Sequence, residues 1–215
     1  MLIRRIFLRV ALAALAVVCV AGPSVASAGE TDPKLFVAHL ADTAMQTMTG
    51  KGIPDSDRAS RFRALFTTDV DMHEIGRFVL GRYWRGATAE QQQEFLHAFE
   101  DIVVLTWSTR FKDYGGDLKH TVTNATADGE HGFIVESKVD RDRQQPIQLQ
   151  WRVRETDAGL RVVDLVVEGS SMAITYRSEY ASVIQANGGS VDGLLSAMRA
   201  KVTQMQAGAS TTKSN

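Results

Sequence analysis

Apolar residues recur at helical spacing in the first part of the chain, and capping residues mark where the helices begin and end. Asp32-Pro33 is a favoured helix start and Gly50 a favoured stop, so we expect a first helix between them. Residues 54–57 begin a second helix. Its inward positions are expected to be Phe62, Leu65 and Phe66.

Two capping boxes predict the next two helices, because such a box satisfies backbone N–H groups at a helix start. Asp71-Met72-His73-Glu74 precedes a short helix that Gly81 ends, and Thr88-Ala89-Glu90-Gln91 precedes the longest helix, which ends at Gly115-Gly116. The long helix carries a broad apolar stripe of Phe95, Phe99, Ile102, Val103, Trp107 and Phe111. We expect this stripe to pack against another layer of the protein.

After Gly116 the hydrophobic period changes from helical to two. Ile147, Leu149, Trp151 and Val153 alternate with polar residues, which is typical of a half-buried antiparallel strand. The same alternation holds for Phe133, Val135 and Val139. With turns at Asp128-Gly129 and residues 157–159, we expect a four-stranded meander near 118–127, 131–140, 146–155 and 160–168.

The last predicted strand is apolar on both faces except at Asp164, and a helix follows it directly. Gly169 breaks the strand, and Ser170 or Ser171 supplies the N-cap oxygen for a helix over about 171–186. A second helix is expected over about 190–206, followed by a disordered tail over 208–215. Helices, an antiparallel sheet and further helices make an α+β fold, with one domain over 29–207.

Residues 1–28 have the features of a secretory signal peptide. Arg4, Arg5 and Arg9 precede an apolar run, and Ala26-Ser27-Ala28 is a small-residue cleavage site, so we expect the mature chain to begin at Gly29. The apolar run is short for a membrane span, which favours cleavage over an anchor. Export by the Sec route and by the twin-arginine route both stay open, and both lead out of the cytoplasm.

Composition narrows the function classes further. Hydrophobic residues make up 44% of the chain and charged residues 23%, which is ordinary for a globular domain. Cleavage removes three arginines and no acid, so the formal net charge changes from -1 to about -4. Nothing in this balance indicates nucleic-acid binding. The one cysteine, Cys19, lies within the signal segment, so the mature chain is expected to have no thiol chemistry.

Motifs for catalysis are scarce. The five histidines show no metal-binding spacing, and the chain contains neither a P-loop nor a dinucleotide-binding glycine motif, so we expect no metal and no cofactor. Asp164 has two interpretations. It could be a general base in a small isomerase-like enzyme, or a structural carboxylate that either is hydrogen-bonded near a strand edge or ties the sheet to a helix, and the structural interpretation is the simpler one.

Two stretches of the chain resemble one family. Val162–Asp164, Gly169–Ser171 and Tyr176-Arg177-Ser178-Glu179-Tyr180 match a V-x-D strand, a G-x-S turn and a Y-R-x-x-(F/Y) helix. Upstream, residues 75–84 and 88–95 match a G-R-x-W motif followed by T-x-x-Q-x-x-x-F. Order and spacing agree over roughly residues 30–200 with the periplasmic lipid-carrier proteins of the MlaC type, also called toluene-tolerance or ABC-transporter auxiliary proteins.

This resemblance implies a carrier of phospholipid between the inner and outer membranes, whose sheet and helices enclose the acyl chains in an apolar cavity. The implied partners are an MCE-domain subunit of an inner-membrane ABC transporter and an outer-membrane lipoprotein–porin complex. A family member from a hopanoid-synthesis locus, with a polycyclic lipid as ligand, is the alternative. The implied ligand-binding residues are Phe99, Val103, Trp107, Phe111, Val135, Leu149, Trp151, Leu165, Val167 and Tyr176. Hydrophobic periodicity alone does not separate the wall of a cavity from a filled core.

Overall fold

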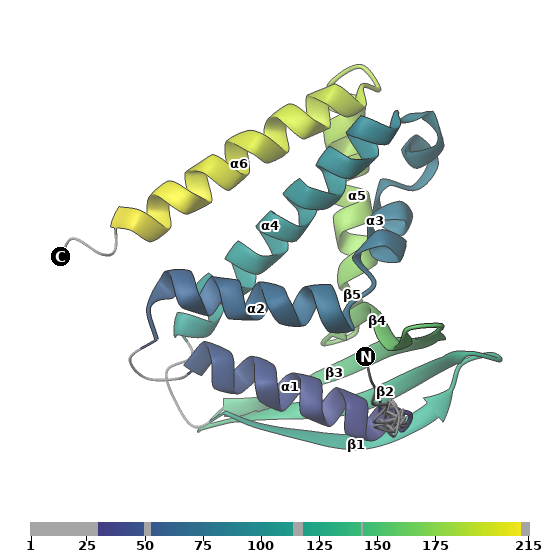
Figure 1. Cartoon of the computed structure of the whole chain (residues 1–215), viewed down its shortest axis with the longest axis vertical. Coiled ribbons are helices and arrows are strands. Elements are labelled where there is room, and N and C mark those ends of the chain that lie inside the picture. Colours follow the sequence, from purple (N-terminus) through teal and green to yellow (C-terminus); the bar gives the residue numbers. More distant parts are fainter. Residues whose placement is uncertain (1–29, 50–52, 114–117, 143, 212–215) are drawn as a thin grey trace, which may run out of the picture.

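A curved antiparallel sheet forms one side of the molecule and helices pack over one of its faces (Figure 1). The computed structural model describes residues 30–49, 53–113, 118–142 and 144–211. The predicted signal peptide, with its cleavage site before Gly29, lies outside these residues. Among the described helices, none combines the length and the apolar character that a membrane span requires.

This part of the chain forms six α-helices and one short 3-10 helix in addition to the sheet. The sheet begins at β1 and ends at β5, a two-residue strand that pairs with the end of β4. The predicted α+β class and four-strand meander are therefore confirmed, and a fifth strand is added. In chain order the elements are α1 Pro33–Thr49, α2 Asp55–Asp69, α3 Met72–Leu80, the 3-10 helix η1 Gly81–Gly86, α4 Ala89–Asp113, β1 Lys119–Ala127, β2 Gly132–Arg141, β3 Gln144–Thr156, β4 Gly159–Val167, β5 Ser170–Ser171, α5 Met172–Ala186 and α6 Val191–Thr211.

The capping hydrogen bonds predicted at two helix starts are present in the structure. The Asp71 carboxylate accepts from the backbone N–H of Glu74 at 2.9 Å, at the start of α3. At the start of α4, the Gln91 N–H donates to the Thr88 hydroxyl at 3.2 Å, and the Thr88 N–H donates to the Gln91 side chain at 3.0 Å. Gly81 ends α3 with a φ of 58°, a left-handed conformation that favours glycine.

At its C-terminal end the chain differs from the prediction. The last helix, α6, continues to Thr211 and so extends into the segment predicted as a disordered tail. Residues 212–215 lie outside the described part of the chain.

A bulge in β4 decides which side chains face the helices. Arg152 pairs with Asp164 and Val153 pairs with Val162, so Val163 is an extra residue between the two pairs. Because cross-strand partners share a face, Val162 before the bulge and Leu165 after it both face the helix side. Asp164 is thereby placed on the other side of the strand, a consequence that hydrophobic periodicity could not reveal.

The core divides into a cluster among the helices and a cluster at the sheet. Phe95 and Phe99, both almost fully buried, lie in the helical cluster with residues of α3, α5 and α6. In the sheet cluster, Val37 of α1 packs with Val135 and Val153. The first helix thus covers one part of the sheet tightly, and the remaining part of the same face is left for the cavity described next.

Candidate functional site: an apolar cavity between helices and sheet

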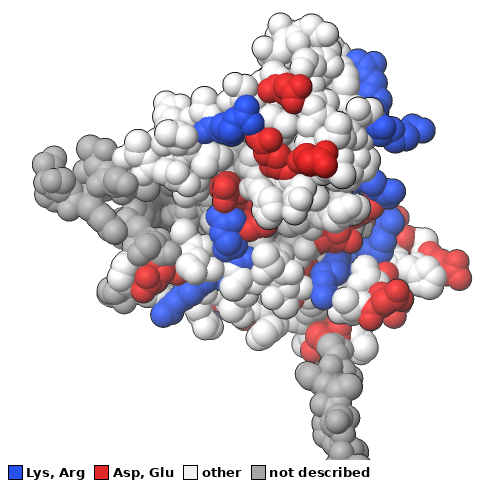
Figure 2. All heavy atoms as spheres, turned by 45° about the horizontal axis from the view of Figure 1, so that its top comes forward, with Lys and Arg blue, Asp and Glu red and all other residues white. Residues whose placement is uncertain are grey.

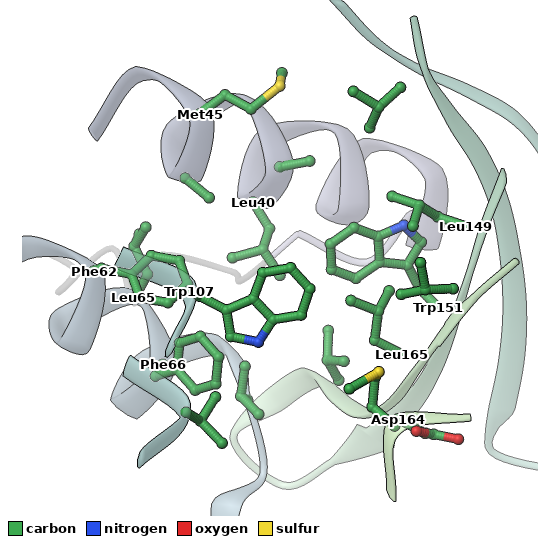
Figure 3. Close-up of a pocket in the computed structure, with 18 of the residues that line it drawn as sticks. Leu40, Met45, Phe62, Leu65, Phe66, Trp107, Leu149, Trp151, Asp164 and Leu165 are labelled. Atoms are coloured by element: carbon green, nitrogen blue, oxygen red, sulfur yellow. The ribbon is translucent and has the colours of Figure 1, made fainter. Parts of the chain in front are cut away.

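A cavity of about 280 Å³ lies between the helices and the uncovered part of the sheet (Figure 3). Helices α1, α2 and α4 supply one wall with Leu40, Met45, Phe62, Leu65, Phe66 and Trp107. Strands β2, β3 and β4 supply the facing wall, which includes Leu149, Trp151 and Leu165. Nearly all of these side chains are aliphatic or aromatic, so the cavity can take a ligand that has a large apolar part.

Most of the residues predicted to bind a ligand lie on this cavity. Eight of the ten line it: Phe99, Val103, Trp107, Leu149, Trp151, Leu165, Val167 and Tyr176. Val135 does not, because it is fully buried beneath α1 in the sheet cluster. Phe111 lies on α4 but outside the described side chains. Contact of these residues with a ligand stays a prediction.

The sequence prediction missed the contribution of the first two helices. Leu40, Ala41, Ala44 and Met45 on α1, and Phe62, Leu65 and Phe66 on α2, all line the cavity. The helical spacing of the α2 residues marked them as inward, and it gave no sign of whether they would meet protein or empty space. The spacing was therefore a signal for burial and not for a binding site.

Contacts within the protein orient two aromatic side chains of the cavity wall. The indole N–H of Trp151 donates to the Ser137 hydroxyl at 2.9 Å, and Ser137 itself is 2% exposed. Tyr176 packs edge-on against Phe99 with ring centres 5.1 Å apart. Because these contacts orient the rings without using a ligand, the wall is preformed and presents mainly carbon to the cavity.

Asp164 borders the cavity, but its carboxylate points away from it (Figure 3). It accepts hydrogen bonds from the Ser171 hydroxyl at 2.6 Å and from the backbone N–H of Ala173 at 3.0 Å. The guanidinium of Arg152 lies 3.8 Å away. Asp164 therefore anchors the first turn of α5 to the sheet, which supports the simpler of its two interpretations and leaves the carboxylate badly placed for a general base.

His120 is a half-buried polar side chain on the cavity. Its ring lies edge-on to Trp151, with ring centres 6.2 Å apart, and its buried Nε2 atom has no hydrogen-bond partner among the described residues. Burial lowers the pKa of His120, and the Asp42 carboxylate on α1 opposes this effect. The described residues contain no group of three or more His, Cys, Asp or Glu side chains that could hold a metal.

Comparisons with known proteins match the chain to a family model, to a named relative and to a solved structure of the same fold. The model of the family described as "MlaC protein" matches residues 38–200. The Haemophilus influenzae protein named "Intermembrane phospholipid transport system binding protein MlaC" is 21% identical over 183 residues, covering 81% of this chain and 84% of that protein. A solved structure of a phospholipid-binding protein from Ralstonia solanacearum, in complex with a phospholipid, has a TM-score of 0.72 and 23% sequence identity, covering 81% of this chain and 99% of that one.

Proposed function

The chain belongs to the MlaC protein family, and on this premise we propose that it is a periplasmic carrier that binds phospholipid and moves it between membranes. The observation that carries the proposal is the apolar cavity, whose two walls come from helices α1, α2 and α4 and from the inner face of the sheet. The named relatives, a phospholipid transport binding protein and a phospholipid-binding protein, support the choice of lipid.

The energetics of such a carrier follow from the burial of acyl chains. Each buried methylene is worth about 0.8 kcal/mol, so one acyl chain of ordinary length is worth roughly 12 kcal/mol. A lipid therefore cannot cross the water between two membranes without an apolar shell. A bilayer offers the same burial, so moving the lipid from membrane to protein has a net free energy near zero. No chemical step is needed, and the proposal makes the protein a carrier and not an enzyme.

The direction of lipid transfer must then be set by the proteins to which the carrier docks. In this proposal the carrier exchanges lipid with an MCE-domain subunit of an inner-membrane ABC transporter and with an outer-membrane lipoprotein–porin complex. It is exported by an N-terminal signal peptide cleaved before Gly29. Basic and acidic side chains are interspersed on the face drawn in Figure 2, which is compatible with docking to protein partners.

Lipid transfer between two vesicle populations tests this function. Donor vesicles carry a self-quenched fluorescent phospholipid, acceptor vesicles carry none, and the rise in fluorescence with added protein is the readout. We expect transfer with the unmodified protein and with Gln150→Asp, whose side chain lies on the outer face of β3. We expect none with Leu149→Asp, which puts the same charge on the cavity wall.

Absence of transfer by the unmodified protein, at concentrations comparable with the lipid, would overturn the carrier proposal. Repeating the assay with a labelled polycyclic lipid separates the hopanoid alternative from the phospholipid. Transfer of the polycyclic lipid alone would keep the carrier and change its cargo.

A further inference from the structure

The cavity has a basic side chain at the end where β1 begins and β2 ends. His120 of β1 pairs with Val139 of β2, and Arg141 lies two residues beyond Val139 on the same strand. His120 and Arg141 therefore face the same side of the sheet at diagonal positions, and both line the cavity. Arg141 is the one cationic side chain among the described lining residues. The Asp164 carboxylate is turned toward α5.

Arg141 is held in place by the backbone and keeps donors to spare. Its Nε and Nη2 atoms donate to the carbonyl oxygen of Gln145 at 3.2 and 2.6 Å. A guanidinium has five N–H donors, so several remain for another acceptor. No carboxylate pairs with Arg141 among the residues that the structure describes. A fixed, half-buried guanidinium without a counter-ion is suited to a phosphate, whose oxygens match its planar fork.

His120 adds a second polar group to this end. Its Nε2 atom has no hydrogen-bond partner in the part of the chain that the structure describes, although it is buried. A buried polar atom without a partner is costly, and a shift of the His120 ring that brought Nε2 to an oxygen of a ligand would remove that cost. The acid that acts on His120 is Asp42, which is exposed on α1, so solvent and salt screen its repulsion of an anion.

From this polar end the cavity extends across the sheet toward β4 and α5. Val167 of β4 and Tyr176 of α5 line the far end. Three strand spacings separate β1 from β4, which is about 14 Å. The side chains between the two ends are apolar, among them Leu149 and Trp151. The cavity therefore has a direction, with a cation at one end and carbon along its length.

We propose that Arg141, with His120 beside it, binds the phosphate of an anionic lipid headgroup, and that the acyl part of the lipid extends from there across the sheet toward Tyr176. This inference rests on the proposed carrier function and adds the orientation of the lipid and the group that selects for phosphate. Arg141 is a specificity residue in this account: it distinguishes a phospholipid from a neutral lipid with the same acyl chains.

The test compares phosphatidylglycerol with diacylglycerol of identical acyl chains, using displacement of a fluorescent fatty acid from purified protein. Arg141→Gln is expected to weaken phosphatidylglycerol binding about tenfold or more, as for loss of a charge-assisted hydrogen bond, and to leave diacylglycerol binding unchanged. The matched control is Arg154→Gln, which removes the same charge from the outer face of β3. This control is expected to leave the binding of both lipids unchanged. His120→Phe is expected to weaken phosphatidylglycerol binding by a smaller factor.

Retained diacylglycerol binding shows that a variant is folded and that its cavity is intact. Equal affinities of Arg141→Gln and the unmodified protein for phosphatidylglycerol would overturn the phosphate site while leaving the carrier proposal in place. Equal weakening of both lipids would do the same. Failure of the unmodified protein to bind either lipid would overturn the carrier proposal itself. Inorganic phosphate is expected not to compete with either lipid, and competition with phosphatidylglycerol alone would assign the site to free phosphate.

Discussion

Two positions on one strand face offer a sharp test of where the cavity ends and the core begins. Leu149 and Val153 both lie on the helix-facing side of β3. Val153 is 2% exposed and packs in the sheet cluster beneath α1, whereas Leu149 is half-buried and borders the cavity. An aspartate introduced at each position therefore meets a different environment.

The expected free energies differ enough to measure. At Val153 a carboxylate would be buried without a partner, which costs several kcal/mol, and the burial of the valine, about 1.5–3 kcal/mol, is also lost. The sum is comparable with the total stability of an ordinary domain, about 5–15 kcal/mol. At Leu149 the carboxylate can be hydrated from the cavity, so the loss is limited to part of the leucine burial, roughly 1–2 kcal/mol.

Circular dichroism melting beside extraction of co-purified lipid measures both properties. We expect Val153→Asp to unfold or melt far below the unmodified protein. At least one of the cavity variants Leu149→Asp, Trp151→Asp and Val167→Asp is expected to stay folded and lose its lipid. Gln150→Asp, on the outer face, is expected to change neither property. Unfolding of all three cavity variants would show that these positions are ordinary core. If all three stayed folded and kept their lipid, the sheet face would not be the pocket.

Three further predictions concern single groups. Asp164→Ala is expected to lower the free energy of unfolding by about 2–4 kcal/mol in urea denaturation, because the first turn of α5 loses its buried acceptor, without changing lipid affinity. Gly81→Ala is expected to lower the free energy of unfolding by about 1 kcal/mol or more, because φ is 58° at this position and an added Cβ would lie 3.2 Å from a guanidinium. The control is Gly86→Ala, which has open space around the added Cβ and is not strained. Burial lowers the pKa of His120 in the folded state, so the unfolded chain binds more protons as the pH falls below about 6.5. Stability between pH 7 and pH 5 should therefore fall more steeply in the unmodified protein than in His120→Phe.

Each of these predictions can fail in a distinct way. A stable Asp164→Ala variant would show that the α5 anchor is unimportant, and a folded, lipid-bound Asp164→Asn variant without function would return a chemical role to this residue. An equal cost at Gly81 and Gly86 would remove the argument from the left-handed backbone. Parallel pH profiles for the unmodified protein and His120→Phe would show that His120 titrates alike in the folded and unfolded chain.

The helices and strands were predictable because their signals are local. The capping boxes at Asp71 and Thr88 bond the backbone within one turn, and the alternation around Trp151 follows from the pleat of a single strand. These signals need no knowledge of distant residues. They therefore appear in the structure where the sequence placed them, within a few residues.

The boundary of the cavity was not predictable, because it depends on contacts between distant segments. Val135 and Leu149 have the same pattern in the sequence, but α1 covers Val135 and leaves Leu149 on the cavity. The bulge at Val163 changes which residues of β4 face inward, and it depends on pairing with β3. The polar end formed by His120 and Arg141 likewise exists only through the pairing of β1 with β2.

Native mass spectrometry of the protein, purified without detergent, tests the central claim most directly. We expect a species heavier than the polypeptide chain by the mass of one phospholipid, confirmed by organic extraction and lost in the cavity variant Leu149→Asp. The protein with Gln150→Asp should retain that added mass. A protein that is uniformly free of lipid in repeated preparations, or whose bound lipid survives Leu149→Asp, Trp151→Asp and Val167→Asp alike, would contradict the claim that this cavity carries lipid.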